Sequence, residues 1–354
     1  MENITSKSCG GGKPNAAMWS GIIFIAAAVL LITAGGRTQQ ARMLALLFSS
    51  IVLEALPFML IGALAGGFIE EFVSRERLAA VLAKCGIFTV FIAASIGILF
   101  PVCECAIVPV VRRLARKGLP VSAVIAFLLA APIVNPVVAA STAVAYKLDF
   151  SVVAYRLILG YLIAVGIGFI FEKMADGENV FVKGIRDEAG ETCHHEEHDH
   201  SHDECSCGCG HNHTGHGKPI TDRLLSSMQH AGSDFMAVGH YLVIGAFIAA
   251  AAQTFIGRSA LLSLTSNPIL MIPVMMVFAI ILNLCSEADA FIAASLRSLV
   301  PFPAQLAFML CGPMFDIKLL MMYRTLFKKD AIWLLATLIL SAVLAVTLLL
   351  HYTR

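Results

Sequence analysis

Residues 119–146 read LPVSAVIAFLLAAPIVNPVVAASTAVAY. The stretch contains no charged side chain and exceeds the roughly 20 residues that an α-helix needs to cross the hydrocarbon core of a membrane. Pro132 and Pro136 interrupt it on either side of Asn135, and proline removes a backbone donor and disturbs the preceding turn. We therefore expect a membrane-crossing segment that is kinked or unwound near its middle.

Apolar segments of similar length occur along the whole chain. Of its 354 residues, 58% are hydrophobic and only 14% are charged, a composition that is hard to explain for a soluble protein. The expected fold class is an all-α polytopic membrane protein with about nine (8–10) transmembrane helices. The apolar segments lie at about 17–35, 43–69, 87–111, 119–146, 150–172, 234–257, 268–296, 303–323 and 330–351.

Two pairs of short matches indicate an internal repeat. Residues 60–63 (LIGA) match 243–246 (VIGA), and residues 126–132 (AFLLAAP) match 307–313 (AFMLCGP), at separations of 183 and 181 residues. Chance similarity among apolar residues is the alternative, but nearly equal separations favour two related halves with broken helices, as in many secondary transporters. The expected domains are an N-terminal membrane half (1–172), a hydrophilic loop (173–233) and a C-terminal membrane half (234–354).

Lysine and arginine predict the orientation of the chain. The strongest short cluster, Arg112, Arg113, Arg116 and Lys117, should lie in the cytoplasm, and the 173–233 loop, two crossings later, should lie there too. A strict count of nine crossings then places the basic residues between 324 and 329 outside. Either one segment is re-entrant or the count differs by one.

The hydrophilic loop carries a metal-ligand pattern. Residues 193–213 read CHHEEHDHSHDECSCGCGHNH, and eight of the eleven histidines lie between 194 and 216. Imidazole and thiolate are the ligands that borderline and soft cations such as zinc and copper prefer, although a solvated linker or an adventitious binder would have the same composition. The expected metal ligands are Cys193, His194, His195, His198, His200, His202, Cys205, Cys207, Cys209, His211, His213 and His216.

Polar side chains within the apolar segments are candidates for the transport site, because burying them in a membrane is costly. Cys103 and Cys105 cannot point the same way from a regular helix, but an unwound segment could turn both thiols and Glu104 towards one cavity. Several acids without nearby bases indicate ion coordination or proton exchange. The candidates are Glu54, Cys103, Glu104, Cys105, Pro132, Asn135, Pro136, Cys285, Glu287, Asp289 and Asp316.

The stretch 100–146 contains PVCEC at 101–105, RRLARKG at 112–118 and APIVNP at 131–136. With these motifs the chain resembles the predicted-permease family that includes ArsP organoarsenical exporters, and the likeness covers most of the membrane portion. The His/Cys-rich insertion is similar to a branch of that family assigned to copper and zinc efflux. The resemblance implies an all-helical permease with two pseudo-repeated halves, and site candidates at Cys103, Glu104, Cys105, Pro132, Asn135 and Pro136.

The chain has no phosphate-binding loop, so a secondary transporter is expected rather than an enzyme, with no required cofactor. The function predicted is proton-coupled efflux of copper or zinc across the cell's inner (plasma) membrane by alternating access. A trivalent organoarsenical exporter and a non-transporting metal sensor or donor are the alternatives. The expected partners are the lipid bilayer and metal ions, with no nucleic acid, and a homo-oligomer is left open.

Overall fold

The computed structural model describes residues 39–72, 86–99, 103–174, 180–182, 185, 220–255 and 267–353. In these residues the regular structure is α-helical, apart from one isolated antiparallel bridge between Phe181 and Phe327. The all-helical fold class is therefore confirmed. The helices are α2 (Gln39–Phe72), α4 (Phe88–Leu99), α5 (Glu104–Arg116), α6 (Val121–Ala130), α7 (Pro136–Ala145), α8 (Phe150–Met174), α9 (Ile220–Phe255), α11 (Pro268–Leu282), α12 (Ser286–Ser295), α13 (Phe302–Met314), α14 (Ile317–Tyr323) and α15 (Lys329–Thr353).

Five segments of the described chain are long and apolar enough to cross a membrane. Four are the single helices α2, α8, α9 and α15, and the fifth runs through the broken pair α13 and α14, Phe302–Tyr323. The pair α6 and α7 is built the same way from two shorter apolar helices. These segments confirm a polytopic membrane protein.

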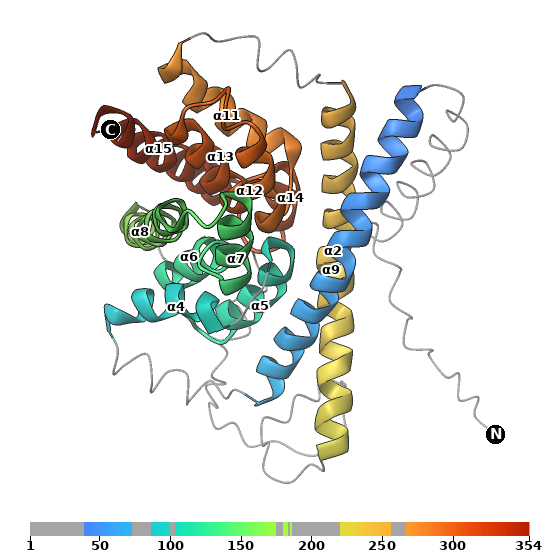
Figure 1. Ribbon diagram of the computed structural model, residues 1–354. Helices are drawn as coiled ribbons and strands as arrows, with labels where there is room; N and C mark the ends of the chain where they lie inside the picture. Colours follow the sequence, from blue (N-terminus) through green and yellow to red (C-terminus); the bar gives the residue numbers. More distant parts are fainter. Residues whose placement is uncertain are drawn as a thin grey trace, which may run out of the picture.

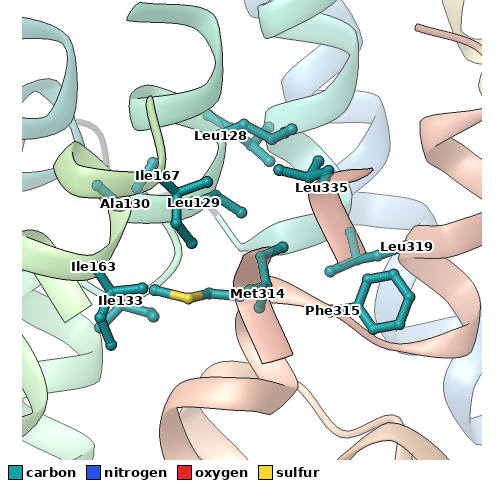
Figure 2. Close-up of a cluster of buried hydrophobic side chains, with 14 of the residues drawn as sticks. Leu128, Leu129, Ala130, Ile133, Ile163, Ile167, Met314, Phe315, Leu319 and Leu335 are labelled. Atoms are coloured by element: carbon teal, nitrogen blue, oxygen red, sulfur yellow. The ribbon is translucent and has the colours of Figure 1, made fainter. Parts of the chain in front are cut away.

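Six of the described helices pack as two bundles of three. In one, α6 packs against α4 and α8; in the other, α13 packs against α11 and α15 (Figure 1). Small residues allow close approach in the first bundle, since a Cβ atom at Gly97 would lie 2.6 Å from the Cα atom of Ala131. Figure 2 shows the apolar cluster where the bundles meet, formed by Leu128, Leu129 and Ala130 of α6, Ile133, Ile163 and Ile167 of the first half, and Met314, Phe315, Leu319 and Leu335 of the second half.

The long helices α2 and α9 cross each other beside the bundles (Figure 1). They run in opposite directions, because Phe48 stacks edge-on against Phe247 and Gly67 lies against Ser227. Glycine also brings α2 close to α5, where a Cβ atom at Gly62 would lie only 2.2 Å from the carbonyl oxygen of Ala106. The α2–α9 pair is therefore packed directly against the start of α5.

The order of the helices supports the expected internal repeat. Helices α5 and α12 begin 182 residues apart, at Glu104 and Ser286, and α7 and α14 begin 181 residues apart, at Pro136 and Ile317. Among the described residues, each half has a long helix, then two short helices, a broken crossing and a final long helix. The described helices of the two halves thus match six to six, in the same order.

The short helices α4 and α5 form a hairpin that enters from one side and returns to it. Helix α8 runs antiparallel to α6, because Gly168 lies against Ser122 at the start of α6. Near that same end of α8, Phe169 contacts Phe91 in α4 with ring centroids 5.7 Å apart, whereas Gly97 near the end of α4 meets the break after α6. Helix α4 therefore runs inwards from the side where α5 ends at Arg116, which we call the basic side.

Helices α11 and α12 form the corresponding hairpin from the opposite side. Helix α13 begins there, since Phe302 contacts Tyr155 near the start of α8 with ring centroids 5.7 Å apart. Helix α11 runs parallel to α13, because Phe278 contacts Phe308 while Asn283, just after α11, reaches Asp316, just after α13. The two halves therefore have inverted topology, the arrangement found in many secondary transporters.

This topology accounts for the basic residues that the crossing count placed outside. The amide of Lys328 donates to the carbonyl of Val180, and the amide of Val182 donates to that of Leu326, so 324–328 lies on the basic side beside the end of α8. The segments 87–111 and 268–296 are hairpins in the described chain, which resolves the conflict. The segment at 17–35 lies outside the described residues, and α9 begins at Ile220, inside the span expected as loop.

Candidate substrate site between the two hairpins

The residues that directly precede α5 and α12, which we call the tips of the two hairpins, line one cavity. Cys103 precedes α5 and Cys285 precedes α12, and both have extended backbone angles at the helix N-cap, with φ of −77° and −76°. Neither side chain is used to cap its helix, so both thiols are available for other contacts. The clusters Cys103-Glu104 and Cys285-Ser286-Glu287 therefore have corresponding positions in the two halves.

A cavity of about 100 Å³ lies between these tips and α2. The cluster 103–105 lines it from the first half, Cys285 and Glu287 line it from the second half, and Glu54 reaches it from the middle of α2. The Cys285 thiol interacts with the Glu54 carboxylate. Cys103, Glu104 and Cys105 all line this cavity, but only Cys103 is extended, because Glu104 and Cys105 form the first turn of α5. That they bind the substrate stays a prediction.

Glu104 makes an ion pair that joins the two halves. The ammonium of Lys318, at the start of α14, donates to Oε1 of Glu104 at 3.1 Å, and both side chains are almost completely buried. The second carboxylate oxygen, Oε2, has no hydrogen-bond partner in the described chain. Lys318 also lies 3.8 Å from Oδ2 of Asp316. The sequence analysis did not single out Lys318. Its expectation that the buried acids lack nearby bases is wrong for Glu104, because Lys318 pairs with it.

Asp316 and Asn283 hold the two breaks of the second half together. Oδ1 of Asp316 accepts a hydrogen bond from the amide of Leu319 at 2.6 Å and so caps α14. With its side-chain nitrogen facing Asp316, Asn283 donates to both carboxylate oxygens at 3.0 and 2.7 Å. Asn283 itself has a left-handed backbone with φ of 49° and ends α11. Lys318 lines the cavity, whereas Asp316 does not.

Asn135 has the equivalent capping position in the first half. Its Oδ1 accepts a hydrogen bond from the amide of Val137 at 2.8 Å, after the non-helical turn that contains Pro132, and Pro136 is the first residue of α7. Asn135 and Asp316 are thus equivalent, since each lies three residues after a proline and caps the next helix. The candidate residues at this break do not line the cavity; they are Pro132, Asn135 and Pro136.

Asp289 lies away from the cavity and faces a second buried base. Arg156 of α8 is fully buried and donates to Oγ1 of Thr142 at 2.8 Å and to the carbonyl of Ser286 at 2.7 Å. The carboxylates that interact electrostatically with it are those of Asp289 and Glu287. The argument that these acids lack nearby bases is therefore corrected by Arg156 as well as by Lys318.

The expected metal ligands at 193–216 lie outside the described residues. Within the part of the chain that the structure does describe, no group of three or more His, Cys, Asp or Glu side chains is arranged to hold a metal ion. Cys103, Cys105 and Cys285 are free thiols. The cavity thus gathers soft and acidic ligands from three helices without a preformed coordination shell.

A cavity between two inverted helical halves is the arrangement in which secondary transporters bind their substrates. The chain belongs to the predicted permease family, whose model matches residues 40–352. It is 41% identical over 314 residues to the UPF0718 protein YcgR of Bacillus subtilis, an alignment covering 88% of this chain and 99% of that protein.

A second relative comes from Streptococcus mutans and is named as a subunit of a two-component membrane permease complex. It is 36% identical over 286 residues, which cover 81% of this chain and 87% of the relative. No solved structure matches the chain.

Proposed function

We propose that the protein is a secondary-active efflux permease for thiophilic metal cations, copper or zinc. The observation that carries this proposal is the convergence of Cys103, Cys105 and Cys285 on one cavity with the carboxylates of Glu54, Glu104 and Glu287. Thiolates bind soft and borderline cations, and an excess of acidic groups over the single lysine favours a cation as substrate. The incomplete ligand set fits a transported ion, which must bind weakly enough to leave.

The orientation and mechanism follow from the inverted halves. Arg112, Arg113, Arg324 and Lys328 lie on the basic side, which we assign to the cytoplasm by the excess of positive charge in short loops. The His/Cys-rich loop leaves from α8 and returns to α9 on that side, so it would collect ions before transport. The ion would move outwards when the cavity closes towards the cytoplasm and opens towards the outside. A proton gradient across the inner membrane would drive this change.

Replacing Cys103 and Cys105 by serine tests this function. We expect loss of metal export with normal insertion into the membrane, because serine keeps the size of cysteine but does not provide a thiolate. Cys311→Ser is the matched control, since Cys311 is buried in α13 outside the cavity. Unchanged export by the double variant, measured as metal accumulation in sealed everted vesicles, would exclude the proposed site.

A trivalent organoarsenical exporter is the second candidate, and the third cavity thiol, Cys285, favours it because trivalent arsenic also binds thiols. Deleting residues 193–216 separates the candidates: metal export should weaken but survive, arsenical export should not change, and a membrane metal sensor or donor should lose all function.

A further inference from the structure

Lys318 is the one cation among the described residues that line a cavity whose other charged groups are Glu54, Glu104 and Glu287. It comes from the second half of the chain, whereas Glu104 comes from the first, 214 residues away. The close packing of α9 fixes its backbone, because a Cβ atom at Gly245 would lie 2.8 Å from the Cα atom of Lys318. The ammonium therefore occupies the place next to Glu104 that a substrate cation would take.

Only one of the two carboxylate oxygens of Glu104 takes part in this contact. Oε1 accepts from Lys318 at 3.1 Å, but Oε2 is buried and has no hydrogen-bond partner in the described chain. A buried carboxylate oxygen without a partner is costly in a low-dielectric interior. Glu104 is thus placed to accept a second cation at Oε2 or to exchange the first one at Oε1.

The carboxylate of Asp316 is a second anion close to the same ammonium. Oδ2 of Asp316 lies 3.8 Å from Nζ of Lys318, and Asp316 is held in position by the amide of Leu319 and the side chain of Asn283. Asp316 does not line the cavity. A small rotation of the flexible lysine side chain would therefore move its charge from the cavity wall to a fixed acceptor behind it.

We propose that Lys318 is an internal competitor for the substrate cation: the incoming ion displaces the ammonium from Glu104 to Asp316, and the return of Lys318 to Glu104 expels the ion. This proposal rests on the proposed function and names the residue that sets substrate affinity in it. The lysine keeps its proton throughout, and no bond is made or broken. When no ion is bound, Lys318 then always neutralises the charge of Glu104. The protein can therefore return to its inward-open state without burying an isolated charge.

The test is the kinetics of zinc and copper transport in sealed vesicles by Lys318→Met and Asp316→Asn. Lys318→Met removes the competitor, so KM should fall by about tenfold or more, equivalent to roughly 1.4 kcal/mol, while the maximal rate falls because release slows. Asp316→Asn should keep the helix cap, as Asn135 does in the other half, but it removes the acceptor charge, so KM should rise. Lys318→Arg should restore a KM near that of the native protein.

Opposite shifts of KM separate competition from a merely structural ion pair, because a structural defect would lower the maximal rate in both variants without lowering KM in either. Lys173→Met is the matched control, since Lys173 is exposed at the end of α8. If Lys318→Met does not insert, Asp316→Asn alone decides through the sign of its KM change. A native protein that transports neither metal would overturn the proposed function and this inference together, whereas normal native transport with unchanged KM in the variants would overturn only the inference.

Discussion

At the scale of single residues, the sequence locates the acids and thiols of the cavity but not their partners. Glu104, Cys103 and Cys105 stand out because ionisable groups are rare in apolar segments. The same rule applies to Lys318 and Arg156, yet neither was singled out, because their pairing depends on contacts between distant helices. The fold is required to show which buried charge faces which.

The Glu104–Lys318 pair gives the prediction at this scale. Glu104→Gln removes one partner of a buried ion pair, a change that costs on the order of 3–5 kcal/mol when the remaining charge is not compensated. Lys318 keeps only the longer contact to Asp316 at 3.8 Å, so we expect metal transport to fall by more than about tenfold. Initial uptake rates in vesicles measure this, with Glu172→Gln at the exposed end of α8 as control. Equal rates for the two variants would contradict a role for Glu104.

At the scale of elements, the sequence predicts where the helices break better than how they pack. The breaks at Asn135 and Asp316 follow from polar residues three positions after a proline, and both residues cap the next helix. A proline alone does not mark a break: Pro109 and Pro273 lie inside helices α5 and α11, and Pro313 lies in the last turn of α13.

Helix packing at Gly62 gives a second prediction. Alanine normally stabilises a helix relative to glycine by up to about 1 kcal/mol, but at Gly62 its Cβ atom would lie 2.2 Å from the carbonyl oxygen of Ala106. We expect Gly62→Ala to lower the melting temperature in detergent, with an overpacking cost of about 1–3 kcal/mol. Gly166→Ala in α8 is the control, because nothing lies within 4 Å of its added Cβ atom. A Gly62 variant at least as stable as the Gly166 variant would show that α2 and α5 do not pack as described.

At the scale of the whole molecule, the sequence gives the repeat but not its inversion. The matches near Gly62 and Gly245 reveal two related halves, and hydropathy alone treats the hairpins 87–111 and 268–296 as ordinary crossings. A hairpin and a crossing have the same apolar composition, so only contacts such as Phe91 with Phe169 distinguish them. The basic residues at 324–329 were the one sign in the sequence that a segment turns back.

The inverted topology predicts which exposed positions share a side. Cysteines introduced at Ile87 and Arg324 should react with a membrane-impermeant maleimide from the basic side, and those at Leu270 and Leu299 from the opposite side. The experiment uses intact cells and everted vesicles, in a background whose native cysteines outside the cavity are replaced by serine. Labelling of the Leu270 and Leu299 positions from opposite sides would show that α11 and α12 cross the membrane instead of returning.

The central claim is transport of a thiophilic metal cation through the cavity between the two hairpins. Its most direct test is uptake of copper(I), zinc and methylarsenite into sealed everted vesicles that contain the native protein, with and without an imposed proton gradient. We expect gradient-stimulated accumulation of copper or zinc. Accumulation of methylarsenite alone would assign the cavity to the arsenical, and accumulation of none of the three would contradict the claim.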